Sequence, residues 1–194
     1  MHSHHFLSIF KETGALLEGH FQLTSGLHSP HYFQCARVLQ YPQYAELLCS
    51  VIAARYRDQR IDAVVAPALG GIVVGQEVGR QLGVRAMFTE RKDGVMQLRR
   101  GFELREGDRV LVCEDVVTTG GSVHEVLAIV KSLGVKVAGV ACIVDRSGGK
   151  VRFDVDETQY VAVLTMDVVT YQPTECPLCK AGVPVTKPGS RGNM

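Results

Sequence analysis

The sequence contains no apolar run near the roughly 20 residues that a membrane-spanning helix needs. Residues 1–10 are rich in histidine and lack the charged-then-apolar order of a secretion signal. The formal net charge is only +1, which gives no general argument for binding nucleic acid or a membrane surface. The six cysteines are scattered, and most lie in apolar or helical patterns, which indicates reduced thiols rather than a disulfide framework. We therefore expect a cytoplasmic protein without a nucleic-acid or membrane partner.

Two familiar phosphate-binding motifs, GxxxxGK[ST] and GxGxxG, are also missing. A different candidate occupies residues 110–122, which read V-L-V-C-E-D-V-V-T-T-G-G-S. An apolar strand pattern ends at Glu114 and Asp115, and small residues then lead into a helical pattern. Backbone N–H groups of such a loop, aided by the helix dipole, can surround one phosphate. The carboxylates would repel phosphate and suit the neutral hydroxyls of a ribose, so the segment predicts a sugar-phosphate site.

The same segment permits a simpler interpretation, a tight turn from strand to helix. Ser122 and Glu125 form an S-x-x-E pattern, which predicts Ser122 as the N-cap of the helix that follows. A plain turn of this kind uses glycine and a capping serine, but it does not need two carboxylates and two threonines.

Short apolar strands alternate with helices after residue 62, which predicts an α/β fold with a parallel sheet covered by helices on both faces. We expect an amphipathic helix at 6–17, a second helix at 41–57 and a short strand at Tyr32–Phe33. The further expected strands are 63–66, 84–89, 109–114 and 136–144, and the expected helices are 71–82 and 123–133. Residues 90–101 are rich in charge and glycine, which indicates an exposed, mobile loop or a hairpin.

Residues 110–122 resemble the phosphoribosyl pyrophosphate signature of the type I phosphoribosyltransferases, from the strand and the acid pair through T-T-G-G-S. The resemblance implies a central, mostly parallel sheet flanked by helices, with a small N-terminal hood. It implies that Glu114 and Asp115 hold the ribose hydroxyls, and that Gly70 and Gly71, in the loop 66–71, bind pyrophosphate. The 5′-phosphate would lie in the loop formed by Val116, Val117, Thr118, Thr119, Gly120, Gly121 and Ser122.

Residues 21–26 and 29–33 resemble the N-terminal signature of the orotate phosphoribosyltransferases, and Arg146 matches the arginine by which that family contacts the orotate ring substituents. The implied activity is transfer of phosphoribose from phosphoribosyl pyrophosphate to orotate, which yields orotidine 5′-monophosphate and pyrophosphate in pyrimidine (UMP) biosynthesis. The implied orotate contacts are Thr24, Tyr32, Phe33, Thr118 and Arg146. Surface exposure of Arg146, or core packing of the two aromatic rings, would be the simpler interpretations.

The family closes a flexible basic loop over its site, and Arg91 and Lys92 match the start of that loop. The resemblance implies that Arg91, Lys92 and Asp115 serve catalysis, and that some loop residues reach the partner of a homodimer with a shared active site. It also implies a Mg²⁺ ion bound mainly through the substrate, and no metal ligated by the protein alone.

The chain departs from the family pattern where lysine is common, at Thr24 and Gly70, and residues 95–102 replace the usual lysine and histidine. We hypothesise that Arg99 or Arg100 supplies some of the missing charge. Two alternatives remain open: a phosphoribosyltransferase for another base, purine or uracil, and a non-catalytic regulator that senses phosphoribosyl pyrophosphate.

The expected organisation is one domain over residues 1–194. It comprises N-terminal helices and the hood (1–60), the core sheet with the donor-binding loops (61–170) and a surface tail (171–194).

Cys176 and Cys179 form half of a zinc-ribbon pattern. A structural zinc needs two further ligands, and no second C-x-x-C exists. One of the seven histidines could help only if the fold brought it there. We expect a tail with two free thiols.

Overall fold

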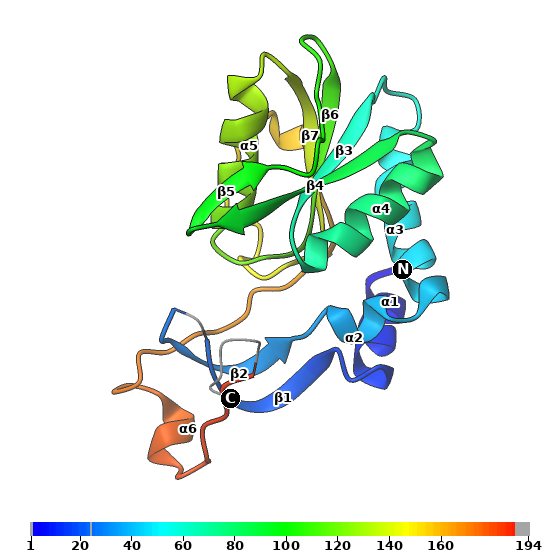
Figure 1. Cartoon of the computed structure of the whole chain (residues 1–194). Coiled ribbons are helices and arrows are strands. Elements are labelled where there is room, and N and C mark those ends of the chain that lie inside the picture. Colours follow the sequence, from blue (N-terminus) through cyan, green and yellow to red (C-terminus); the bar gives the residue numbers. More distant parts are fainter. Residues whose placement is uncertain (1, 24, 189–194) are drawn as a thin grey trace.

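A six-stranded sheet forms the body of the protein (Figure 1). The computed structural model describes residues 2–23 and 25–188. The strand order is β5-β4-β3-β6-β7-β8, and every neighbouring pair is parallel except the β4–β5 hairpin. This arrangement confirms the expected, mostly parallel sheet. The strands are β3 (Ala63–Pro67), β4 (Arg85–Lys92), β5 (Val95–Leu98), β6 (Arg109–Val117), β7 (Lys136–Asp145) and β8 (Tyr160–Thr165).

Helices cover both faces of this sheet because its central strands are apolar on both sides. In β3, Val64 and Ala66 belong to the cluster that includes α4 (Gly70–Leu82), beside which α3 (Pro42–Tyr56) packs. Ala63 and Val65 point the other way, into the cluster that contains α5 (Gly121–Ser132). Because successive side chains of β3 point to opposite faces of the sheet, the strand packs against a layer of helices on each side, as the sequence predicted.

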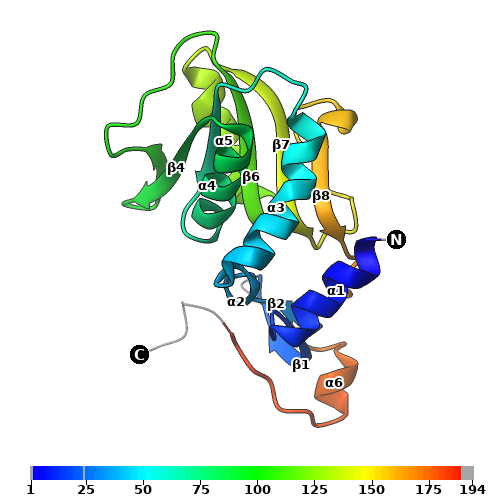
Figure 2. The same ribbon diagram turned by 90° about the vertical axis from the view of Figure 1, so that its right-hand side faces the viewer.

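A small second layer, which we call the hood, lies at one end of the core (Figures 1 and 2). It consists of the antiparallel strands β1 (Leu16–Gln22) and β2 (His28–Phe33), beside α1 (His2–Glu12) and α2 (Ala36–Leu39). The expected helix at 6–17 was placed too late in the chain: α1 begins at His2 and ends at Glu12, because Gly14 adopts a left-handed conformation (φ 64°) that ends the helical turn. The apolar residues that follow belong to β1 instead.

The C-terminal segment lies on the surface but is attached to the hood. The backbone N–H of Gln22 donates to Thr186 O (2.9 Å), and Thr186 N–H donates to His20 O (2.8 Å). On the other strand, His28 and Tyr171 exchange two backbone hydrogen bonds of 2.9 Å. The short helix α6 (Pro177–Lys180) lies between these two contacts along the chain. The hood is therefore built from both ends of the sequence.

The remaining expected elements agree with the structure to within a few residues, although β6 continues through the acid pair to Val117. The strands β1 and β8, the short helices α2 and α6 and the 3-10 turn η1 (Glu157–Gln159) had not been expected. Among the described residues, none of the helices combines the length and apolarity that a bilayer crossing requires.

Candidate functional site

The candidate site lies where β3, β6 and β7 reach their carboxyl ends. Because these strands are parallel neighbours, the loops that follow them meet at one edge of the sheet. The loop after β3 carries Gly70 and Gly71, the loop after β6 carries the T-T-G-G-S sequence, and Arg146 directly follows β7.

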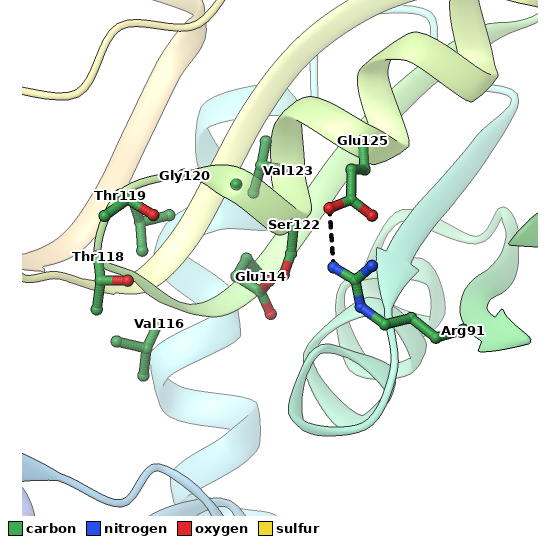
Figure 3. A pocket seen from close by; sticks show the side chains of 11 residues that line it. Arg91, Glu114, Val116, Thr118, Thr119, Gly120, Ser122, Val123 and Glu125 are labelled. Carbon is green, nitrogen blue, oxygen red and sulfur yellow. Dashed lines mark hydrogen bonds and ion pairs between the residues drawn. The ribbon is translucent and has the colours of Figure 1, made fainter. Parts of the chain in front are cut away.

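The loop after β6 encloses a pocket of about 210 Å³ (Figure 3). Gly120 adopts a left-handed conformation (φ 76°) and is the N-cap of α5. A Cβ at this position would approach Phe153 and Val151 to 2.9 Å. The backbone conformation and the lack of space therefore each exclude a side chain here. The prediction that Ser122 caps the helix was wrong, because α5 already begins at Gly121. The N–H groups of the first turn are left to bind an anion. The lining residues are Arg91, Glu114, Val116, Val117, Thr118, Thr119, Gly120, Gly121, Ser122, Val123 and Glu125.

The two acids differ in their surroundings. Glu114 is only 7% exposed, and burial, together with the neighbouring Asp115, raises its pKa well above its usual range. Its Oε1 accepts a hydrogen bond of 3.0 Å from the backbone N–H of Asp115. Asp115 is less buried and lines the adjoining pocket described below.

The two glycines after β3 lie directly against these acids. A Cβ on Gly70 would collide with the carboxylate of Asp115, and one on Gly71 would approach Glu114 Oε1 to 3.1 Å. A lysine at position 70 would therefore displace the Asp115 carboxylate. This contact gives a physical reason why this chain has glycine where the family commonly has lysine. The two loops that were expected to share the donor thus lie in contact.

A second pocket, of about 590 Å³, adjoins the first. The two pockets share Val116, Thr118 and Thr119, so a sugar phosphate in the first would be next to a base in the second. The second pocket is lined by Leu23, Ser25, Tyr32, Phe33, Gln34, Cys35, Asp115, Val116, Thr118, Thr119 and Arg146.

Arg146 provides the positive charge of this second pocket. Its guanidinium carbon lies 5.9 Å from the centre of the Phe33 ring, which places it over an aromatic face. Its Nε is buried and has no hydrogen-bond partner within the described part of the chain. Burial lowers the pKa of Arg146, and the nearby Tyr32 and Cys35 oppose that shift. A half-buried cation whose buried Nε lacks a partner is costly, and an anionic ligand would satisfy it.

The two aromatic residues that were expected to contact the orotate ring both line this pocket. Phe33 is buried and packs edge-on against Phe10, with ring centres 5.8 Å apart. Tyr32 packs against Phe21 (5.8 Å), and burial raises the pKa of its hydroxyl while Arg146 lowers it. The remaining expected base contact, Thr24, lies outside the described residues.

The basic residues of the β4–β5 hairpin do not all reach the site. Arg91 lines the smaller pocket and forms an ion pair of 2.8 Å with Glu125 of α5 (Figure 3). The side chain of Lys92 is exposed and lines neither pocket. Arg99 and Arg100 both bind Glu90, at 3.2 and 2.7 Å, and neither lines the two pockets.

Sequence reasoning missed several lining residues. Glu125 was interpreted as part of a helix cap, whereas its carboxylate binds Arg91. Val123, in the first turn of α5, was missed as well. The other missed residues, Leu23, Ser25, Gln34 and Cys35, come from the hood. Leu23 and Ser25 flank Thr24 in the signature segment, which was the available signal. No sequence signal pointed to Cys35, because a cysteine in an apolar pattern usually belongs to the hydrophobic core.

Known proteins agree with this geometry. A family model described as "Phosphoribosyl transferase domain" matches residues 36–174. An orotate phosphoribosyltransferase from Chlorobium phaeobacteroides is 58% identical over 188 residues, which span 97% of this chain and 96% of that relative. One from Caldicellulosiruptor bescii is 54% identical over 186 residues, which span 96% of each chain.

Comparison with solved structures tests whether the fold alone can distinguish phosphoribosyltransferases that are named for different bases. The orotate phosphoribosyltransferase of Aeropyrum pernix has a TM-score of 0.67 and 25% identity, over 81% of this chain and 92% of that chain. The adenine phosphoribosyltransferase of Rhodothermus marinus scores 0.65 at 18% identity, over 82% and 99%. Enzymes named for different bases thus share this fold, so the fold alone does not distinguish them. The distinction comes from the high sequence identity to the two orotate phosphoribosyltransferases described above. On that identity, and on a family model that covers most of its length, this chain belongs to the orotate phosphoribosyltransferases, with the type I phosphoribosyltransferase fold.

Proposed function

We propose that this chain transfers phosphoribose from phosphoribosyl pyrophosphate to orotate, forming orotidine 5′-monophosphate and pyrophosphate for UMP biosynthesis. The observation that carries the proposal is Arg146, a half-buried guanidinium whose buried Nε has no partner among the described residues, in a pocket that adjoins a phosphate-binding loop. Orotate is a flat pyrimidine with a carboxylate, so it supplies both the anion for Arg146 and a ring for the aromatic side chains. The relatives that are more than half identical carry the corresponding name.

The donor end of the reaction depends on the two loops in contact. The N–H groups at the start of α5 bind the 5′-phosphate, while Asp115 and Glu114 accept hydrogen bonds from the ribose hydroxyls. Gly70 and Gly71, at the start of α4, offer N–H groups to the pyrophosphate. Their contact with the acids places that group beside the ribose.

Catalysis then rests on charge and alignment. The bond from the anomeric carbon to pyrophosphate breaks ahead of the new carbon–nitrogen bond, and orotate attacks as its anion, so little proton transfer is required. Negative charge grows on the departing pyrophosphate, where the N-terminus of α4 and Arg91 stabilise it. Arg91 lines the phosphate pocket together with Glu114, the acid that lies against Gly71 at the start of α4. Arg146 and the aromatic side chains hold orotate in line with the anomeric carbon.

Glu114 and Asp115 also fit a Mg²⁺ ion that is bound mainly through the substrate. Two adjacent carboxyl groups, one with a raised pKa, form a region that a cation would stabilise, and Mg²⁺ prefers oxygen ligands. When bound, the ion would neutralise negative charge on the departing pyrophosphate.

The purified chain, given the donor sugar, Mg²⁺ and orotate, should consume the ultraviolet absorbance of orotate, and omission of Mg²⁺ should stop the reaction. Hypoxanthine, guanine, adenine and uracil are assayed in parallel. Conversion of one of these bases with orotate inert would identify a phosphoribosyltransferase for another base. Donor binding without conversion of any base would identify a regulator instead.

Arg91→Ala should lower kcat by roughly 10- to 150-fold, since one hydrogen bond to a charged group is worth about 1.5–3 kcal/mol. The donor KM should change less, because the charge develops as pyrophosphate leaves. Arg105→Ala is the matched control, because this exposed arginine precedes β6 at the opposite end of that strand. Equal kcat values for the two variants would remove Arg91 from the mechanism.

The remaining proposals concern assembly and location. We propose a homodimer in which Lys92, exposed on its own subunit, serves the partner's site. Light scattering should then give about twice the 21.2 kDa of one chain, and a monomeric mass at assay concentration would contradict it.

We place the reaction in the cytoplasm, where free thiols and a phosphorylated donor persist, and fractionation of cells tests this.

A further inference from the structure

Four side chains with metal-binding atoms meet where the C-terminal segment contacts the hood. They are His20 of β1, His28 of β2, and Cys176 and Cys179 at the two ends of a C-x-x-C turn. One ligand atom from each lies within 4.8 Å of all the others. Figures 1 and 2 both show α6 beside the β1–β2 hairpin, although about 150 residues separate them in sequence. The fold therefore supplies the two histidines that the C-x-x-C pattern lacked.

The spacing of these atoms is close to that of a tetrahedral zinc site. Zn–S bonds of about 2.3 Å and Zn–N bonds of about 2.0–2.1 Å place tetrahedral ligand atoms about 3.4–3.8 Å apart. Cys176 Sγ lies 3.5 Å from His20 Nε2, and Cys179 Sγ lies 3.7 Å from the same nitrogen and 3.3 Å from His28 Nδ1. The two ring nitrogens are 2.8 Å apart, so they need to separate by about half an ångström.

The surroundings orient the ligands before any ion binds. His20 Nδ1 lies 2.8 Å from the carbonyl oxygen of Val183, to which it can only donate a proton. Its Nε2 then presents a lone pair to the other three groups, the arrangement that a second hydrogen bond commonly fixes in metal-binding histidines. Cys176, His20 and His28 are 0%, 2% and 6% exposed, while Cys179 is at the surface and gives an ion a route in.

We propose that His20, His28, Cys176 and Cys179 bind one zinc(II) ion as a structural site. Two sulfur and two imidazole ligands suit zinc rather than magnesium or calcium, which prefer oxygen. Four protein ligands fill a tetrahedral shell and leave no open position for substrate, which is typical of a structural rather than a catalytic ion. The site is separate from both pockets, none of whose lining residues it uses.

The ion would fasten the C-terminal segment across the hood. Backbone pairs already join His20 to Thr186 and His28 to Tyr171, so the metal would lock contacts on both strands of the hairpin. The same hairpin carries Tyr32 and Phe33 into the larger pocket. Zinc would thus hold the base-binding wall in place without touching the base.

Metal content of the full-length, untagged chain tests the proposal. After growth with zinc and gel filtration, elemental analysis should find one zinc per chain. Cys179→Ser and His28→Gln should each lose at least nine-tenths of it, and Cys179→His, which keeps a ligand, should retain it. Two controls should keep a full equivalent: His31→Gln on the same strand, and a His4→Gln/His5→Gln variant that removes competing histidines near the N-terminus.

Cobalt provides a measurement that does not depend on how well the variants fold. The wild-type chain, stripped of metal and given one equivalent of Co²⁺, should show the intense visible bands of a tetrahedral site and a thiolate-to-cobalt charge-transfer band. Zinc should displace that spectrum. A wild-type zinc content equal to that of Cys179→Ser, or a weak octahedral cobalt spectrum without charge transfer, would overturn the proposal. Because these readouts involve no substrate, they stand whether or not the chain acts on orotate.

Discussion

Replacing Arg146 with alanine should raise the KM for orotate roughly 100-fold and change the KM for the sugar donor less than about threefold. A bidentate pair between guanidinium and carboxylate contributes two hydrogen bonds to charged groups, each worth about 1.5–3 kcal/mol, and tenfold in binding costs about 1.4 kcal/mol. Arg146 lines the pocket expected to hold the base and is absent from the lining of the phosphate pocket. The loss of affinity should therefore affect orotate much more than the sugar donor.

Steady-state kinetics with each substrate varied in turn measures this difference. Arg146→Lys should recover only part of the affinity, because an ammonium group cannot form the planar fork. Arg152→Ala is the matched control, since that arginine is exposed and does not line either substrate pocket. If both KM values rose equally in Arg146→Ala, the residue would not be the group that recognises the base.

Replacing Asp115 with asparagine should lower kcat/KM roughly 100- to 1,000-fold and leave the fold intact. The change removes a negative charge that lies against Gly70 and that we propose accepts hydrogen bonds from the ribose, with almost no change in shape. Weakening two charge-assisted hydrogen bonds to the ribose hydroxyls costs about 3–4 kcal/mol, at about 1.4 kcal/mol per tenfold in rate. The partial positive charge on the ribose also loses a stabilising neighbour as pyrophosphate departs.

Thermal unfolding of Asp115→Asn separates a loss of activity from a loss of structure. Its midpoint should lie close to that of the wild type, because relief of the repulsion with Glu114 offsets the lost interactions. Asp154→Asn, which removes a surface carboxylate paired with Lys131, should keep both stability and activity near normal. A kcat/KM near the wild-type value in Asp115→Asn would exclude the ribose contact.

The part of the site that the sequence predicted well is contiguous. Residues 114–122 run from the end of β6 into the first turn of α5, so the carboxyl groups, the phosphate loop and the helix N-terminus follow each other in sequence as in space. The parallel sheet with helices on both faces was predictable from equally local evidence, the alternation of strands and helices along the chain. The boundary errors, at residues 13–17 and at Ser122, arose where glycine conformation overrode the apolar or capping pattern.

Contacts between distant segments could not be predicted in this way. The resemblance pointed to Arg91 and Lys92, and charge alone suggested Arg99 or Arg100, yet of these four residues Arg91 alone lines the phosphate pocket. Neighbouring side chains of a strand point to opposite faces, and the pairing of the hairpin with the core decides which of them faces α5. The contact between Gly70 and Asp115 joins loops on neighbouring strands, and no local pattern records it.

The sequence by itself determined the fold class, the donor loop and the family, because each depends on residues that are neighbours in the chain. Tertiary structure alone decided that Arg146 lies half-buried beside the hood, with a buried Nε that has no partner among the described residues, and that two histidines join Cys176 and Cys179. Both depend on how distant segments of the chain pack together, and the free energy of that packing comes from the whole core rather than from any short segment.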